Sequence, residues 1–153
     1  MLRVVVDTNI FVSGLLSRKG APAQTLAAWR KRRYLLVVSP ALIAEILTVL
    51  SDSILKRKYS LVHEDVTELG HLLEVDALVV PGQAEVAGSV PTDPDDEIIL
   101  ACALDGEVDF SVSGDHHLLG LGKFRDIPIF TIRQFLERLE GDIEEQAKYD
   151  IES

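Results

Sequence analysis

Three consecutive valines at residues 4–6 constrain most strongly what this chain can fold into. A short β-branched apolar run is typical of a strand buried on both faces, as in the centre of a parallel sheet. Asp7, Thr8 and Asn9 follow at once. Ligands of open parallel sheets bind in the crevice outside the carboxyl ends of the strands. Asp7 is therefore predicted to lie at that edge, although taken alone it is better explained as a turn residue or a helix N-cap.

Composition indicates an ordinary globular protein. The 153 residues fit one domain, and no apolar run approaches the ~20 residues of a membrane span. Asp7 interrupts the first apolar stretch, which argues against a signal peptide. Cys102 is the only cysteine, so an intrachain disulfide is excluded and the thiol is expected to be a small buried hydrophobe. A cytoplasmic location with no membrane contact is expected.

The charge distribution limits the class of partner. A net charge of −10, from 15 basic and 25 acidic residues, argues against broad attraction to nucleic acid or anionic membranes. Positive charge is nevertheless concentrated in two clusters, which we consider weak candidates for contact with nucleic acid: Arg30, Arg32 and Arg33 with Lys31, and Lys56, Arg57 and Lys58. Cations in a last helical turn also complement the helix dipole, so the first cluster has an ordinary structural explanation.

Strands and helices are predicted to alternate. Apolar runs predict strands at residues 2–6, 34–38, 77–80, 108–112 and 127–130, the last at a sheet edge because it contains Pro128. Helices are expected over residues 9–16, from 21 to the basic cluster, from 40 to about 50, over 64–74 and 93–104, and after a capping box at Thr131 and Gln134. Residues 56–58 are read as a connector and 81–91 as a loop. This order predicts a parallel α/β sheet with helices on both faces, in one domain of residues 1–140 with an acidic tail at 141–153.

Four acidic residues are predicted to meet at the carboxyl edge of this sheet: Asp7, Glu45, Asp96 and Asp115. Each has an ordinary explanation by itself. Glu45 suits a helix surface, Asp96 a helix dipole and Asp115 a turn. Four such coincidences at one edge are less probable than any single one, so we interpret the set as a site.

Carboxylates that converge in a crevice repel each other and raise each other's pKa. A hard divalent cation removes that repulsion, and Mg²⁺ or Mn²⁺, as one or two ions, suits an all-oxygen set of ligands. His116 and His117 are adjacent, and adjacent residues of a helix point in different directions, so they do not form a zinc pair. The sequence contains no P-loop, dinucleotide-binding glycine fingerprint or G-x-S-x-G motif.

The four acidic motifs, taken together, resemble the PIN-domain nucleases over about residues 2–139. Residues 4–9 are similar to the opening strand and first acid of that family. Residues 39–45 are similar to its second motif, and residues 93–96, which lead into 100–103, to its third. Residues 112–115, followed by Leu118 and Leu119, are similar to the fourth. Each motif is weak alone, but four in this order and spacing are specific.

The resemblance implies a three-layer α/β/α fold with strand order 3-2-1-4-5 and a Mg²⁺- or Mn²⁺-dependent ribonuclease site. It assigns metal ligation to Asp7, Glu45, Asp96 and Asp115, and supporting roles to Asn9 and Ser113. Many small members are toxins of the VapC type, usually dimeric and held inactive by an antitoxin. The sequence departs from the family pattern at two positions. His117 stands where many relatives have a further Asp, and Ser113 where Thr is commoner.

The function predicted from the sequence is therefore endonucleolytic cleavage of single-stranded RNA, with carboxylates that hold metal. A receiver-like or phosphatase-like domain that forms an aspartyl phosphate is one alternative. Against it, Asp7 lacks a following Asp-Gly-Thr pattern, and no lysine comes directly after the fifth strand. A nucleic-acid- or protein-binding module with the same fold but no catalysis is the other alternative. The acidic composition and the missing second Asp favour that alternative.

Overall fold

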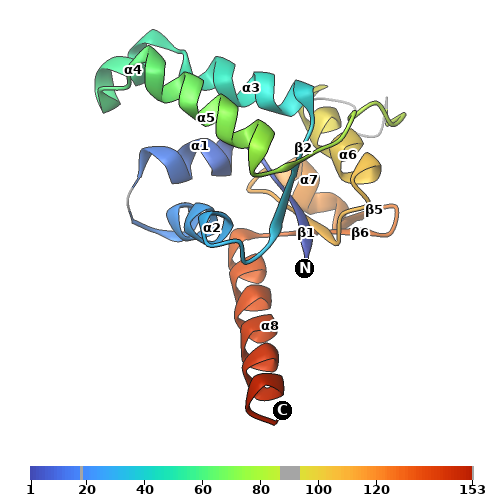
Figure 1. Cartoon of the computed structure of the whole chain (residues 1–153). Coiled ribbons are helices and arrows are strands. Elements are labelled where there is room, and N and C mark those ends of the chain that lie inside the picture. The colour runs from blue at the N-terminus through green and yellow to red at the C-terminus, as the bar shows by residue number, and fades with distance from the viewer. Residues whose placement is uncertain (18, 87–93, 153) are drawn as a thin grey trace.

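Strands and helices alternate along the chain (Figure 1). The computed structural model describes residues 1–17, 19–86 and 94–152. Its strands are β1 (Arg3–Val6), β2 (Leu35–Val38), β3 (Leu78–Val79), β4 (Phe110–Val112), β5 (Lys123–Phe124) and β6 (Ile127–Phe130). Its helices are α1 (Thr8–Leu16), α2 (Ala21–Arg30), α3 (Pro40–Leu50), α4 (Ser53–Tyr59), α5 (His63–Val75), α6 (Pro94–Asp105), α7 (His116–Leu121) and α8 (Ile132–Glu152).

The sheet has the order β3-β2-β1-β4-β6-β5, and among these described strands only β5 runs antiparallel to its neighbour. The predicted order 3-2-1-4-5 is confirmed for the five parallel strands, because the strand predicted at residues 127–130 is β6. The edge position expected for that strand is wrong, since β5 pairs with it through Lys123 and Phe124. A strand of two residues is too short to show a period of two in the sequence.

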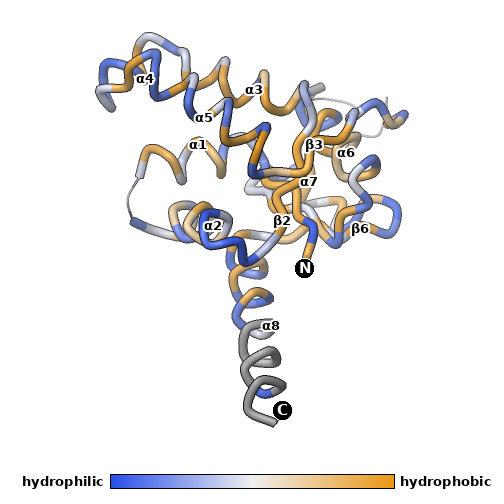
Figure 2. The backbone as a smooth tube through the Cα atoms, in the orientation of Figure 1, coloured by the Kyte–Doolittle hydropathy of each residue, from blue (hydrophilic) through white to orange (hydrophobic). Residues whose placement is uncertain are grey.

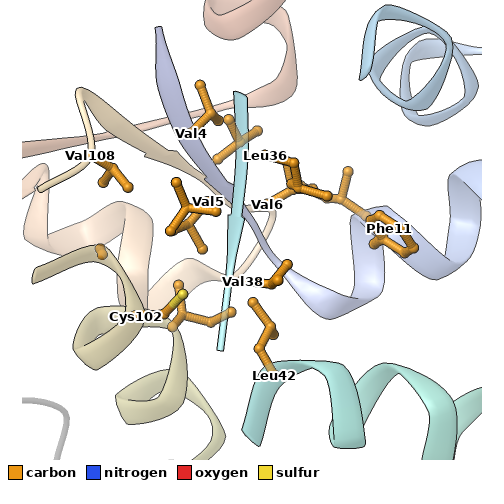
Figure 3. Close-up of a cluster of buried hydrophobic side chains, with 14 of the residues drawn as sticks. Val4, Val5, Val6, Phe11, Leu36, Val38, Leu42, Cys102 and Val108 are labelled. Atoms are coloured by element: carbon orange, nitrogen blue, oxygen red, sulfur yellow. The ribbon is translucent and has the colours of Figure 1, made fainter. Parts of the chain in front are cut away.

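The three valines of β1 form the centre of the core. Val4 and Val5 have no exposed surface and Val6 is 1% exposed, as predicted for a strand covered on both faces. β1 pairs in parallel with β2 on one side and with β4 on the other. Figure 3 shows Phe11 of α1 and Cys102 of α6 on opposite sides of β1 and β2. Full burial of a Val or Phe side chain of this core stabilises the fold by roughly 1.5–3 kcal/mol.

Helices cover both faces of the sheet, so the three-layer prediction is confirmed. On one face α6 packs against β1, β2 and β4. On the other face α1 packs against α2, and α2 against α8. The ring of Phe135 in α8 lies 5.0 Å from that of Tyr34 and 5.6 Å from that of Phe110. The apolar colour in Figure 2 is concentrated on the strands. Within the described ranges, no helix is both long and apolar enough to cross a membrane.

The connector predicted at residues 56–58 is instead helical and belongs to α4. Asp52 caps this helix, because its Oδ1 accepts hydrogen bonds from the backbone N–H groups of Ile54 and Leu55 at 2.9 and 3.2 Å. Asp is one of the residues preferred at the N-cap of a helix. Asp52 was therefore a signal for the start of α4 in the sequence. The basic run at residues 56–58 was nevertheless interpreted as a connector.

The last helix begins with the predicted capping box. The backbone N–H of Thr131 donates to Oε1 of Gln134 at 2.8 Å, and the backbone N–H of Gln134 donates to Oγ1 of Thr131 at 3.2 Å. α8 continues as one helix to Glu152, so the acidic residues up to 152 extend it and form no separate element. Figure 1 shows this helix extending away from the sheet. The predicted helix start at Asp93 and the end of the predicted loop lie outside the described residues.

Thr131→Ala removes one of these two capping bonds. We expect the free energy of unfolding to fall by about 1 kcal/mol, the usual effect of losing a hydroxyl N-cap. Denaturant unfolding followed by circular dichroism measures the change. Thr48→Ala, at an exposed position within α3, is the control and should change stability by less than about 0.5 kcal/mol. Equal stability of the two variants would show that the capping box contributes nothing measurable.

Candidate functional site

Asp7 lies where β1 ends, and only 8% of its surface is exposed. Its backbone N–H donates to the carbonyl of Val112 at 2.9 Å, which continues the pairing of β1 with β4. Its Oδ1 accepts from the backbone N–H of Asn9 at 3.3 Å and so caps α1. The ordinary interpretation of Asp7 as an N-cap is thus correct. It is compatible with a functional role, because capping leaves the carboxylate at the carboxyl edge of the sheet.

Ser113 connects Asp7 to Asp115. Its hydroxyl is fully buried, donates to Oδ2 of Asp7 at 2.8 Å and accepts from the backbone N–H of Asp115 at 3.0 Å. Asp115 in turn caps α7, because its Oδ1 accepts from the backbone N–H groups of His117 and Leu118 at 2.7 and 3.2 Å. A continuous hydrogen-bonded path therefore holds the first and last predicted acids at the ends of neighbouring strands.

A cleft of about 360 Å³ opens at this edge. Helices α1, α2, α7 and α8 and the turn after β4 all contribute to it. Its lining residues are Asp7, Asn9, Ile10, Ser13, Pro22, Gly114, Asp115, His116 and Ile132. Two of the four predicted acids and the predicted supporting residue Asn9 therefore face one space.

Glu45 and Asp96 lie at the same edge of the sheet but on different elements. Glu45 is half-buried in the second turn of α3, which begins where β2 ends. Asp96 is 5% exposed in the first turn of α6, which runs back to the start of β4. One oxygen of each carboxylate is buried, Oε2 of Glu45 and Oδ2 of Asp96, and α3 packs against α6. The described lining of the cleft does not include either residue.

Comparison with known proteins identifies the family. Residues 3–117 match the family model described as PIN domain, a range that contains all four acidic motifs. The chain belongs to the PIN-domain family. A solved structure of VapBC2 from Rickettsia felis bound to a DNA fragment from their promoter is similar in fold, with a TM-score of 0.56 and 15% identity. The likeness covers 85% of this chain and 98% of that chain. A search of curated proteins gives no match.

The chemistry of the acidic residues in this PIN domain suits a hard divalent ion. Asp7, Glu45, Asp96 and Asp115 offer oxygen atoms only, as Mg²⁺ and Mn²⁺ prefer. In the part of the chain that the structure describes, no three His, Cys, Asp or Glu side chains lie close enough together to hold an ion. The oxygen-only donor set of the four acidic residues fits such an ion in chemical type.

The first basic cluster lies at the opposite edge of the sheet. Arg30, Arg32 and Arg33 come just before β2, and the amino ends of parallel strands lie far from their carboxyl ends. Arg30 and Arg32 line a separate cleft of about 370 Å³ that also contains Tyr34 and Asp76. Arg32 and Asp76 form a long ion pair of 3.9 Å between exposed groups. Such a pair contributes little to stability.

The second basic cluster, Lys56, Arg57 and Lys58, forms the last turn of α4, where cations complement the helix dipole. Figure 1 shows α4 at the far end of the α3–α5 pair. α1 leads from the carboxylate cleft towards this region, because Leu15 and Leu16 line a small groove together with Leu61 and Val66. The C-terminal end of α1 thus lies beside Leu61, close in sequence to the second cluster, whereas the first cluster is at the opposite edge of the sheet.

His116, and not His117, lines the carboxylate cleft. Consecutive helical residues point about 100° apart, so two adjacent histidines need not face the same space. Sequence reasoning singled out His117, because it occupies the position of a further Asp in many relatives. The start of α7 at Asp115 was not predicted from the sequence, and this start decides which of the two histidines faces the cleft. Ser13 was also missed, although it is one helical turn from Asn9 and so shares its face of α1.

Cys102 is not a nucleophile in this PIN domain. Burial raises the pKa of its thiol to about 12, a hydrogen bond with Ser39 lowers it in part, and the charge of Asp105 raises it further. Since the thiolate is the reactive form, the group stays protonated and inert near neutral pH. The prediction of a small buried hydrophobe is confirmed, because Cys102 has no exposed surface.

Divalent ions should stabilise the folded chain by mass action. At a hundredfold excess over the dissociation constant, we expect Mg²⁺ or Mn²⁺ to add ~2.7 kcal/mol to the free energy of unfolding, visible as a higher Tm. Asp7→Asn should reduce this increase. Asp126→Asn, at an exposed position between β5 and β6, should leave it intact. A Tm that does not respond to millimolar concentrations of either ion would contradict metal binding.

Proposed function

We propose that this chain is a Mg²⁺- or Mn²⁺-dependent endoribonuclease that cleaves single-stranded RNA. The observation that carries the proposal is the hydrogen-bonded path from Asp7 through Ser113 to Asp115, at the edge of a cleft in a PIN-domain chain. This path fixes two carboxylates at the edge where open parallel sheets bind their ligands.

In this proposal Asp7, Glu45, Asp96 and Asp115 hold the ion, directly or through water. When bound, one or two ions would polarise the scissile phosphate, activate water and neutralise the leaving oxygen. The chain's own part is to orient the ligands. Ser113 donates to Oδ2 of Asp7, and the backbone N–H of Asn9 donates to Oδ1, so both oxygens of this carboxylate have defined directions. Outer partners of this kind typically change metal affinity or activity 10–100-fold.

RNA cleavage by substituted chains tests the proposal. Asp7→Asn should lower the rate by more than about a hundredfold, beyond the ~10–100-fold loss expected for Ser113→Ala. Wild-type cleavage should require added Mg²⁺ or Mn²⁺ and stop with a chelator. Asp126→Asn is the matched control, because it makes the same change at an exposed position outside the cleft.

The same experiment tests the alternative of a binding module without catalysis. The acidic composition and His117, which stands where many relatives have a further Asp, favour that alternative. RNA that binds but remains uncut with both ions, in wild type and Asp7→Asn alike, would support the binding module and contradict the nuclease.

Phosphate contacts are proposed to come mainly from the second basic cluster, because α1 connects its surroundings with the cleft. Lys56→Glu, Arg57→Glu and Lys58→Glu combined should weaken RNA binding and reduce its salt dependence by a slope of about 2, at ~0.7 for each lost contact. The control is the combined reversal of Arg30, Arg32 and Arg33 at the opposite edge. Filter binding over a range of salt concentrations measures both slopes. If the two triple variants behave alike, the RNA path along α1 is wrong.

A toxin role with an antitoxin partner, and a homodimeric state, are the finer part of this proposal. VapBC2, the protein of similar fold, is solved as a complex bound to a promoter DNA fragment. If this chain is part of such a pair, a small protein encoded beside it should co-purify with it and suppress its RNA cleavage.

A further inference from the structure

The carboxylate cleft extends beyond the carboxylates along α1. Asn9 and Ser13 are four residues apart and so lie on one face of the helix, about 6 Å apart along its axis. His116 of α7 lines the same space. Short polar side chains therefore continue past the proposed metal ligands for about the length of one helical turn.

The cleft also has an apolar wall, which metal binding would not require. Ile10 of α1, Pro22 of α2 and Ile132 of α8 contribute to it. Ile10 is 5% exposed, and the other two are half-buried. A volume of about 360 Å³ is at the lower end of the ~300–1,000 Å³ range of small-molecule sites. The space thus suits one flat, partly apolar group.

The charges of the cleft exclude a bare phosphate from this outer part. Asp7 and Asp115 are acidic, and the described lining contains no Lys or Arg. A neutral group that is apolar on its faces and polar at its edge matches the lining better. A nucleobase has this chemistry, and unpaired bases of single-stranded RNA are recognised by side-chain contacts to their faces and edges.

We propose that the part of this cleft beyond Asp7 and Asp115 is a nucleobase subsite, in which Ser13 and His116 contact the polar edge of one unpaired base beside the bond to be cut. The subsite rests on the proposed ribonuclease function and names its substrate more closely. Ile10, Pro22 and Ile132 contact the face of the base. Ser13 and His116 are positioning residues, and they set a preference for one base next to the cleavage point. Paired RNA is excluded, because a stacked base cannot enter the cleft.

Binding of free nucleosides tests the subsite without metal or catalysis. Adenosine, guanosine, cytidine and uridine are titrated separately, in EDTA, into the ¹⁵N-labelled chain. At least one should shift the amide signals of Ser13 and His116. Ser13→Ala or His116→Ala should weaken the binding of that nucleoside about fivefold or more, which is the effect of one lost hydrogen bond.

His117→Ala is the matched control, because it removes the same side chain one position away, where it does not line the cleft. Its affinity for the nucleoside should equal that of the wild type. The subsite is refuted if no nucleoside shifts these signals at millimolar concentration. It is equally refuted if Ser13→Ala and His116→Ala both bind as tightly as wild type, or if His117→Ala weakens binding as much as they do.

Cleavage mapping on a random-sequence RNA separates the subsite from the nuclease. The wild type should prefer one base at a fixed position beside the cut, and Ser13→Ala or His116→Ala should flatten that preference while cutting continues. If RNA is cut and neither variant alters the base preference, the subsite is refuted and the nuclease proposal stands. Nucleoside binding in the cleft with no RNA cleavage refutes the nuclease and leaves the subsite.

Discussion

The hydrogen bond between Ser113 Oγ and Asp7 Oδ2 depends on the parallel pairing of β1 with β4. Val6 lies opposite Val112 in that pairing, so the next residue of each strand emerges at the same edge. The bond of 2.8 Å can form only in this register. A slip of one residue would turn each valine of β1 towards the helices of the opposite face, so the packing of these buried side chains also holds the site in place. The packing of the core and the geometry of the site therefore both depend on the register of β1 with β4.

Asp7 and Asp115 are helix N-caps as well as predicted metal ligands. Each accepts backbone N–H groups at the start of a helix, Asp7 for α1 and Asp115 for α7. These bonds hold the two carboxylates in fixed directions before any ion arrives. Since asparagine caps a helix about as well as aspartate, Asp7→Asn keeps the cap, but it removes the charge and replaces the oxygen that accepts from the Ser113 hydroxyl with an amide N–H₂ group. Loss of function in that variant can thus be assigned to the carboxylate, which supplies both the charge and the acceptor for Ser113.

The sequence predicted the fold well where local signals agreed with the long-range pattern. Valine runs and the Thr131–Gln134 capping box located the parallel strands and the start of α8. Prediction failed for β5, whose two residues carry no period, and for α4, where a basic run concealed the cap at Asp52. Within the site, only the rotation of α7 decides that His116 and not His117 faces the cleft. Convergence of Glu45 and Asp96 on one ion stays a prediction.

The separation of charge in this chain indicates how affinity and selectivity for RNA would be divided. Carboxylates occupy one edge of the sheet, Arg30 and Arg32 line a cleft at the other, and Lys56 to Lys58 lie on α4. Charge attraction acts on every RNA sequence alike, so cations distant from the cleft can add affinity but no selectivity. Selection must come from uncharged contacts close to the carboxylates. In the proposed nucleobase subsite, Ser13, His116 and the apolar wall would supply these contacts, and they would reach a base only where the RNA strand is unpaired.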